Sequence, residues 1–173
     1  MTFLKSSRLI TACTCLLVAI FLTLPVINGL GAQKADAVLV IKSKSRLYLM
    51  YKGEPIASFH VTFGKNPKGH KIKRGDERTP EGHYILDYKN PNSKFHKSIH
   101  ISYPNSVDRA NAKHLGVSPG GDIMIHGQTN GWGWASPIVQ FFPWTDGCVA
   151  LSNKDMDQVW EAVDPGTPIE IRP

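Results

Sequence analysis

The residues of this chain that are best suited to chemistry are a cysteine and a histidine that lie well apart in the sequence. Cys148 follows Thr145-Asp146-Gly147 and precedes the apolar Val149-Ala150-Leu151. A thiolate is a strong nucleophile, but a thiol at neutral pH usually needs a neighbouring base, most often histidine, to form one. His126 ends the short apolar stretch of residues 122–126, and a strand end is a rigid platform for such a base. The pair predicts nucleophilic catalysis, provided that the fold brings the two residues together. Without such a partner, a histidine at a strand end is more often a structural hydrogen-bonding residue.

The glycine before the cysteine has a further use in this chemistry. Gly147 lets the backbone turn tightly beside the sulfur. A tight turn can aim successive backbone N–H groups at one point and so form an oxyanion hole. Such a hole stabilises the charge that develops when a thiolate attacks a carbonyl. The sequence therefore predicts acyl chemistry rather than a structural thiol.

The start of the chain has the layout of a targeting segment. Lys5 and Arg8 precede a largely apolar run over residues 9–27, and small residues follow up to residue 37. This is the pattern of a secretory signal, and the run is also long enough for an uncleaved membrane anchor. We expect residues 1–37 to be a signal peptide or an N-terminal membrane anchor, and residues 38–173 to form one domain. The protein is then exported to the periplasm or cell envelope, with anchoring to the inner membrane through residues 9–27 as the alternative to cleavage.

The cysteine count and the charge narrow the class of protein. Of the three cysteines, Cys13 and Cys15 lie in the expected leader, so the exported domain keeps Cys148 as its single thiol and has no internal disulfide. The other explanation for a lone cysteine is a small buried apolar residue. The domain carries about +4 of the chain's net charge of +6. A modest positive charge suits an anionic wall polymer or membrane surface, or solubility alone, and the absence of an arginine-rich block argues against nucleic acid.

The hydrophobic pattern predicts a mainly β domain with a few short helices, of the α+β class. A long polar loop is expected over residues 64–79, because this stretch is rich in glycine and polar residues. The histidines are scattered without metal-ligand spacing, so we expect no metal and no cofactor. Strands are predicted at residues 38–41, 46–51, 56–63, 83–88, 98–103, 122–126 and 169–171, and helices at residues 105–114 and 152–163.

Several motifs in order resemble those of the YkuD-type L,D-transpeptidases. Ile125-His126-Gly127, a spacer, and Thr145-x-Gly147-Cys148-Val149 resemble the active-site motif of that family. Upstream, Gly75-Asp76-x-Arg78-Thr79-Pro80-Glu81-Gly82 and Ile101-Ser102-Tyr103-Pro104-Asn105 are also similar. The long spacer and the upstream run resemble the YafK-like branch. The resemblance implies a YkuD-like β-sandwich catalytic domain that acts on peptidoglycan stem peptides.

The resemblance also implies roles for individual residues. Cys148 is the expected nucleophile and His126 the general base, with the carbonyl of Gly127 orienting the imidazole. The backbone amides of Asp146, Gly147 and Cys148 are expected to form the oxyanion hole. Asp146 stands where the common family motif has histidine, and an anion beside Cys148 should raise the pKa of the thiol.

The residues expected to bind substrate are less closely tied to the motif. The resemblance implies that Tyr103 and Arg78 line the cleft. Trp132, Trp134 and Trp144 lie between the base and the nucleophile in the sequence, where they either form a lid over the substrate or simply pack an irregular segment.

Three functions follow from the resemblance. The first is a peptidoglycan L,D-transpeptidase, expected to be a monomer, that forms a thioester between Cys148 and a stem peptide and transfers it to an acceptor amine. The second is an L,D-endopeptidase or amidase that hydrolyses the same thioester, and the third is an inactive wall-binding module.

Overall fold

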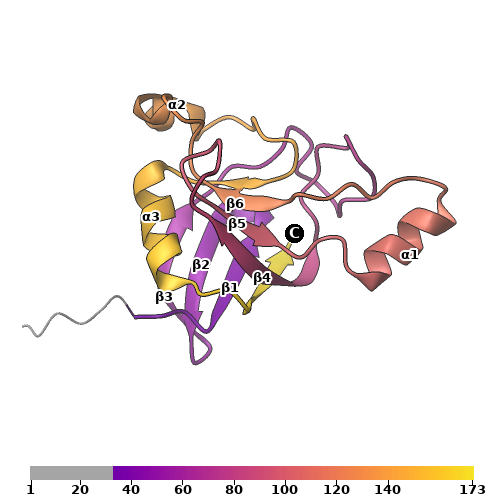
Figure 1. Cartoon of the computed structure of the whole chain (residues 1–173), viewed down its shortest axis with the longest axis horizontal. Coiled ribbons are helices and arrows are strands. Elements are labelled where there is room, and N and C mark those ends of the chain that lie inside the picture. The colour runs from indigo at the N-terminus through magenta and orange to yellow at the C-terminus, as the bar shows by residue number, and fades with distance from the viewer. Residues whose placement is uncertain (1–32) are drawn as a thin grey trace, which may run out of the picture. The chain divides into compact units, whose positions relative to one another are not determined.

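The computed structural model describes residues 33–173 of the chain (Figure 1). The signal or anchor segment predicted for residues 1–37 therefore lies mostly outside the described residues, and stays a prediction. Residues 35–37 take part in the fold, because Ala35 is buried and its N–H donates to the carbonyl of Ala162 at 2.9 Å. The folded part thus includes residues just before the boundary expected at Val38.

Eight strands form one curved sheet in the order β3-β2-β1-β8-β4-β5-β6-β7. The last strand in sequence, β8, lies between β1 and β4, parallel to the first and antiparallel to the second. The strands are β1 (Ala37–Ile41), β2 (Arg46–Tyr51), β3 (Glu54–His60), β4 (Gly82–Asn90), β5 (Ser98–Ile101), β6 (Met124–His126), β7 (Val149–Ala150) and β8 (Thr167–Arg172).

The two ends of the sheet approach each other just beyond β3. Thr62 follows the end of β3, and it exchanges two backbone hydrogen bonds of 2.9 Å with Ala150 in β7. This closure brings the segment after β3 against the strand that follows Cys148. The mainly β architecture with short helices predicted from the sequence is confirmed, in the form of one continuous sheet that curls into a half-barrel.

The helices are α1 (Ser106–His114), α2 (Ser136–Val139) and α3 (Asn153–Ala162), with 3-10 turns η1 (Lys42–Lys44) and η2 (Gly133–Ala135). The α3 helix is capped by Ser152, whose side chain accepts the N–H of Asp155, and its apolar face buries Met156 and Val159 in the core. Figure 1 shows α3 beside β2 and β3, with α1 on the other side of the domain. Within residues 33–173, no helix has the length and apolar character needed to cross a bilayer.

The core consists of alternate residues of the strands together with the apolar face of α3. Val38 and Val40 of β1 lie beside Ile169 and Ile171 of β8, and all four are essentially inaccessible to solvent. At one end of the same sheet, Ile125 of β6 and Val149 and Ala150 of β7 are equally inaccessible to solvent. These two short strands are therefore firmly packed where they adjoin His126 and Cys148.

Candidate active site

The register of two short parallel strands places the predicted nucleophile and base on one face. Ile125 of β6 pairs with Val149 of β7, so Cys148 lies opposite Met124 and two positions before the level of His126. Residues two apart on a strand point to the same side, and so do directly opposed residues on parallel neighbours. Cys148 and His126 therefore face the same way, and both line one cavity of about 800 Å³.

His126 is a buried histidine with one ring nitrogen already engaged. Its side chain is 2% exposed, and Nδ1 lies 2.7 Å from the carbonyl oxygen of Gly127. Because a carbonyl oxygen only accepts, Nδ1 carries the proton and Nε2 is left with its lone pair in the neutral ring. Burial lowers the pKa of His126 to about 4, although the hydrogen bond to Gly127 works in the other direction. The imidazole is therefore neutral at pH 7 and able to accept a proton.

Two aromatic rings enclose the imidazole of His126. The ring centroid of Phe95 lies 4.5 Å from that of the imidazole, and Trp144 meets it edge-to-face at 5.5 Å. Phe95 comes from the loop before β5, and Trp144 from the segment before Cys148. Both rings also line the cavity. They exclude water from the imidazole, which accounts for the burial that lowers its pKa.

Cys148 is partly exposed at the cavity wall, although protein atoms surround most of its thiol. The N–H of Met124 donates to Sγ at 3.4 Å, and the thiol points at the carbonyl of Asp122, 3.7 Å away. Burial raises the pKa of the thiol, Asp146 raises it further, and the N–H of Met124 and the charge of Lys71 lower it. The effect of Asp146 is the one expected from the sequence, but burial outweighs it. The resting site thus pairs a neutral thiol with a neutral imidazole.

The turn before Cys148 depends on glycine. Gly147 has φ of +119°, and a Cβ at this position would lie 2.4 Å from the carbonyl oxygen of Arg78. Thr145 fixes the turn from within, since its hydroxyl donates to the carbonyl of Cys148 at 2.9 Å and accepts the N–H of Gly147 at 3.3 Å. Within the described part of the chain, the N–H groups of Asp146 and Cys148 have no hydrogen-bond acceptor. Those two donors are therefore the ones free to meet an oxyanion.

A network of polar contacts supports the part of the cavity wall that residues 71–77 form. Lys71 and Asp76 form an ion pair of 2.7 Å with side chains only 3% and 8% exposed. The other carboxylate oxygen of Asp76 accepts the N–H groups of Ile72 and Lys73. Burial alone would raise the pKa of Asp76, but these hydrogen bonds lower it to about 2. The ammonium of Lys71 is thereby held in place at the cavity wall, with its charge compensated by Asp76.

The cavity wall mixes both signs of charge with aromatic and small residues. Its charged side chains are Lys71, Arg74, Glu77, Asp122 and Asp146. Such a wall suits a ligand that itself carries separated carboxylate and ammonium groups. Within residues 33–173, no group of three or more histidine, cysteine, aspartate or glutamate side chains is arranged to hold a metal ion.

The structure does not bring Tyr103 or Arg78 into this cavity. The side chain of Tyr103 is buried, and its hydroxyl donates to the carbonyl of Pro119. The side chain of Arg78 lines a neighbouring cavity with His70, and its contribution to the site is the backbone carbonyl beneath Gly147. A motif in the sequence marks such residues as important without showing which way their side chains point.

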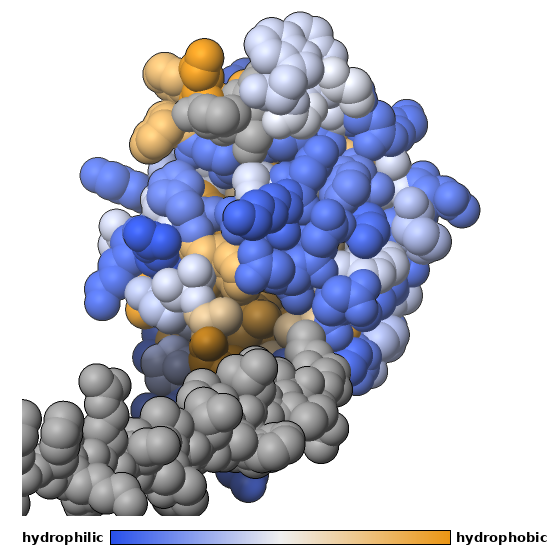
Figure 2. Space-filling view, turned by 90° about the vertical axis from the view of Figure 1, so that its left-hand side faces the viewer, coloured by the Kyte–Doolittle hydropathy of each residue, from blue (hydrophilic) through white to orange (hydrophobic). Residues whose placement is uncertain are grey.

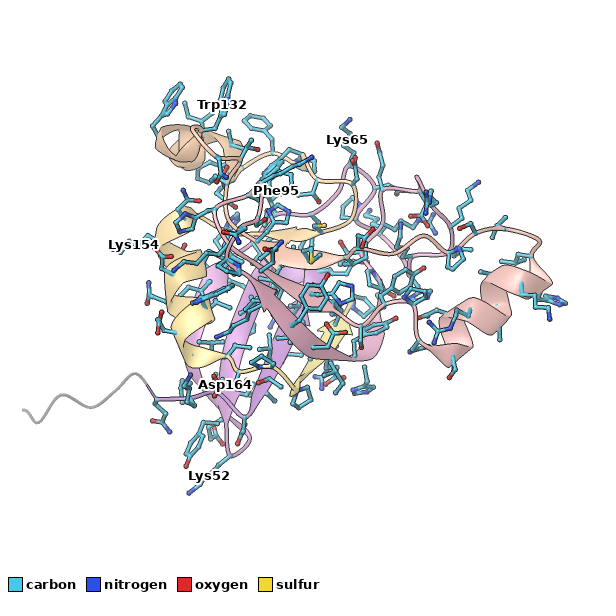
Figure 3. All side chains as sticks on the ribbon, in the orientation of Figure 1. Lys52, Lys65, Phe95, Trp132, Lys154 and Asp164 are labelled. Atoms are coloured by element: carbon cyan, nitrogen blue, oxygen red, sulfur yellow. The ribbon has the colours of Figure 1, made fainter. Side chains whose placement is uncertain are left out.

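The tryptophans between the base and the nucleophile divide into two groups. Trp144 lines the cavity, whereas Trp132 and Trp134 are 59% and 76% exposed and do not line it. Figure 3 shows Trp132 at the outer edge of the domain and Phe95 deeper, toward the strand ends. Sequence reasoning did not identify Phe95 as a site residue, because it lies in a polar loop with no local pattern that points to the site. Thr129, which also lines the cavity, was missed for the same reason.

Residues 35–171 match the family described as YkuD: L,D-transpeptidase catalytic domain. A curated protein of Escherichia coli (strain K12), named "Putative L,D-transpeptidase YafK", is 30% identical over 97 residues. The match covers 55% of this chain and 32% of that protein, so this chain spans about a third of the length of its curated relative.

Solved structures share the fold of this chain. The helical cell shape determining protein Pgp2 from Campylobacter jejuni superposes with a TM-score of 0.59 at 27% identity, covering 78% of this chain and 46% of Pgp2. An L,D-transpeptidase from Xylanimonas cellulosilytica superposes with a TM-score of 0.53 at 15% identity, covering 80% of this chain and 61% of that one. The second likeness concerns the fold alone.

Proposed function

The chain belongs to the family of YkuD L,D-transpeptidase catalytic domains, and we propose that Cys148 is the nucleophile of a peptidoglycan L,D-transpeptidase with His126 as its general base. One observation carries the proposal. Cys148 and His126 line the same cavity, and the hydrogen bond from Nδ1 to Gly127 leaves Nε2 as the proton acceptor. A buried, neutral histidine beside a neutral thiol has the protonation states that general-base catalysis requires.

In the first half of the reaction, a stem peptide enters the cavity with a carbonyl carbon beside Cys148. Nε2 of His126 takes the thiol proton while Sγ forms a bond to that carbon. The oxygen becomes negative, and the free N–H groups of Asp146 and Cys148 stabilise it. The C–N bond then breaks, His126 returns the proton to the leaving amine, and a thioester remains on Cys148.

In the second half, an acceptor amine attacks the thioester. His126 removes a proton from the attacking nitrogen, the C–S bond breaks, and the sulfur regains its proton from the imidazolium. The product is a new peptide bond, and the expected kinetics are ping-pong because one product leaves before the acceptor reacts. The mixed charges of the wall, from Lys71 to Asp146, suit peptides that carry both carboxylates and amines.

Hydrolysis of the same thioester is the second candidate function. The observation that favours it is the presence of Asp122 and Asp146 on the cavity wall near Cys148. A carboxylate can accept a proton from a water molecule, so it can help water compete with an amine. The protein would then act as an L,D-endopeptidase or amidase.

One assay separates these functions. Purified full-length protein is incubated with muropeptides, and the products are identified by mass spectrometry. Cross-linked dimers that appear from monomers support transfer, whereas loss of linkages without new ones supports hydrolysis. The Cys148→Ala variant is the control, and if it retained full activity, both proposals would be wrong. Unchanged muropeptides with the native protein would favour the inactive wall-binding module.

The location of the substrate implies export. We propose that residues 1–37 direct the chain to the periplasm or cell envelope, by cleavage or as an inner-membrane anchor. Fractionation of cells that express the full chain, followed by intact mass of the recovered protein, tests this. A full-length protein in the soluble cytoplasm would contradict it.

A further inference from the structure

The segment between the base and the nucleophile has an unusual surface. Residues 131–144 include no charged residue. Five large apolar side chains in this segment are between 59% and 76% exposed: Trp132, Trp134, Ile138, Phe141 and Phe142. Figure 2 shows an apolar group at the top of the domain, where Figure 1 places α2, above a largely hydrophilic face. Apolar patches exposed in this way commonly mark interaction sites.

The same segment buries a polar residue without satisfying it. Gln140 is 9% exposed, and neither Oε1 nor Nε2 of its amide has a hydrogen-bond partner among the described residues. Buried polar side chains are normally hydrogen-bonded, and leaving one unpaired costs free energy. A segment that exposes apolar side chains and buries an unpaired amide has the properties of a surface that a ligand completes.

Two tryptophans of this segment stack on each other. The rings of Trp132 and Trp134 lie 6.0 Å apart between centroids, with an angle of 21° between their planes. Since Trp134 is 76% exposed, the pair leaves a flat apolar face free to solvent. A flat aromatic face with a polar N–H at its edge fits partners that combine apolar patches with hydroxyl groups. Sugar rings have that character, because their axial C–H groups form an apolar face bordered by hydroxyls.

The pair is attached directly to the mouth of the cavity. The N–H of Trp132 donates to the carbonyl of Thr129, which lines the cavity, at 2.9 Å. Gly133 lies against Asn153, since a Cβ there would be 2.6 Å from Nδ2. The amide oxygen Oδ1 of the same Asn153 side chain accepts the N–H of Gln128 at 2.8 Å. These contacts join the tryptophans to the strand end that carries the base.

We propose that Trp132 and Trp134 form a platform on which the sugar strand of the wall polymer lies while its stem peptide occupies the cavity of Cys148. This inference rests on the proposed function, because it takes the substrate to be a stem peptide. Stem peptides branch from a neutral sugar strand, so that strand must lie close to the mouth of the cavity that receives them. A lipid bilayer is the other partner for exposed tryptophans, but it does not account for a stacked pair fixed to the cavity rim.

The test compares two substrates that share one stem peptide and differ in whether the glycan is attached. One is a stem peptide linked to its glycan strand, and the other is the same stem after an amidase has removed the glycan. For Trp132→Ala and Trp134→Ala, we expect the ratio of kcat/KM for the glycan-linked to the sugar-free stem to fall about tenfold. Phe141→Ala is the matched control, since Phe141 is as exposed as Trp134 but lies outside the pair. Its ratio should stay unchanged.

A binding measurement keeps this inference distinct from the proposed function. Full-length Cys148→Ala protein is mixed with glycan strands from which all stems have been removed, and binding is followed by co-sedimentation. Weaker binding by the Trp132→Ala and Trp134→Ala derivatives supports the platform even if no muropeptide is turned over. Binding to phosphatidylglycerol vesicles is measured in the same way. The platform would be contradicted if all variants bound the glycan equally, or if Phe141→Ala lost as much binding as the tryptophan variants. It would also be contradicted if the tryptophan variants lost binding only to the vesicles.

Discussion

Two of the loops that border the cavity of Cys148 are stabilised in different ways. The first, residues 64–81, is polar and is held by its own ion pair and hydrogen bonds around Asp76. The second, residues 127–147, is largely uncharged and exposes most of its apolar side chains. Its fixed points lie toward its ends, where Asn130 bonds to Lys94 and the carbonyl of Phe142 accepts the hydroxyl of Thr62.

The two loops support different parts of the site: one supports the nucleophile and the other covers the base. The polar loop supports the nucleophile, because the carbonyls of Glu77 and Arg78 pack directly beneath Gly64 and Gly147. The aromatic loop supplies Trp144, which covers the base. Polar contacts therefore fix the turn that carries the sulfur, whereas apolar rings set the solvent exposure of the imidazole. Variants in the two loops should accordingly fail in different ways.

The largest effect is expected at the contact between the polar loop and the nucleophile turn. Gly147→Ala forces a Cβ to within 2.4 Å of the carbonyl of Arg78 at a φ of +119°. We expect the free energy of unfolding to fall by about 4 kcal/mol or more, with loss of activity in whatever fraction folds. Urea denaturation followed by circular dichroism measures this.

Gly53→Ala is the matched control for Gly147→Ala. Gly53 also has a positive φ, +83°, but a Cβ there has no neighbour within 4 Å. Gly53→Ala should lower the free energy of unfolding by only about 1–2 kcal/mol, because a left-handed backbone conformation is unfavourable for alanine. If the two variants were equally stable, the close packing of the polar loop against the turn would not matter for stability.

The next effect concerns the ion pair inside the polar loop. Asp76→Ala leaves the ammonium of Lys71 buried without its carboxylate, and we expect a loss of about 3 kcal/mol in stability. Asp164→Asn breaks the exposed pair with Lys34, and the unfolding midpoint should hardly move.

The pH dependence of stability tests the Lys71–Asp76 ion pair without a substitution. The pKa of Asp76 is lowered to about 2 from an ordinary 3.8. Its carboxylate therefore stabilises the fold fully above about pH 4, and this stabilisation is lost as the pH falls toward 2. Acid unfolding of the Asp76→Ala variant should lack this component, and an unchanged acid profile would contradict the role of the pair.

Variants around His126 should have the smallest effect on stability, but they should change the pH dependence of the reaction. His126 must be neutral to accept a proton, and its pKa is lowered to about 4. The acid limb of kcat/KM should therefore lie near pH 4, with activity rising with pH through that value. Phe95→Leu admits water to the imidazole, so its pKa should rise by about one unit and move the limb to higher pH.

An NMR titration of the His126 ring protons checks this shift independently of turnover. Phe141→Leu is the control, because Phe141 packs against His60 rather than His126. A limb near pH 6.5 in the native protein, or no shift with Phe95→Leu, would show that the aromatic rings do not set the exposure of the base.

Much of the fold could be predicted from the sequence because its signals are local. The aromatic and apolar residues of 46–51 predict a strand, and the capping residue Ser152 with the spacing of Met156 and Val159 predicts a helix. The insertion of β8 between β1 and β4 could not be predicted, because pairing partners depend on contacts between residues distant in sequence. The turn at Gly147 was also predictable, because it depends on a single glycine.

Some residues of the site could likewise be predicted from the sequence, and others could not. His126 and Cys148 were found because each ends or begins a short apolar stretch beside a glycine. Phe95 was not, because only the folded chain brings a polar loop over the imidazole. The side chains of Tyr103 and Arg78 were expected in the cleft and lie elsewhere, because a motif fixes residue type and position but not the direction of a side chain.

In the proposed mechanism, a stem peptide becomes covalently bound to the sulfur of Cys148. Intact-mass spectrometry of the full-length protein, quenched in acid during turnover of a stem peptide, tests it most directly. The proposed mechanism predicts a mass increase equal to the acyl portion of the peptide, located on Cys148 by proteolysis and absent from Cys148→Ala. Turnover by Cys148→Ala, or an acyl group located on any other residue, would contradict it.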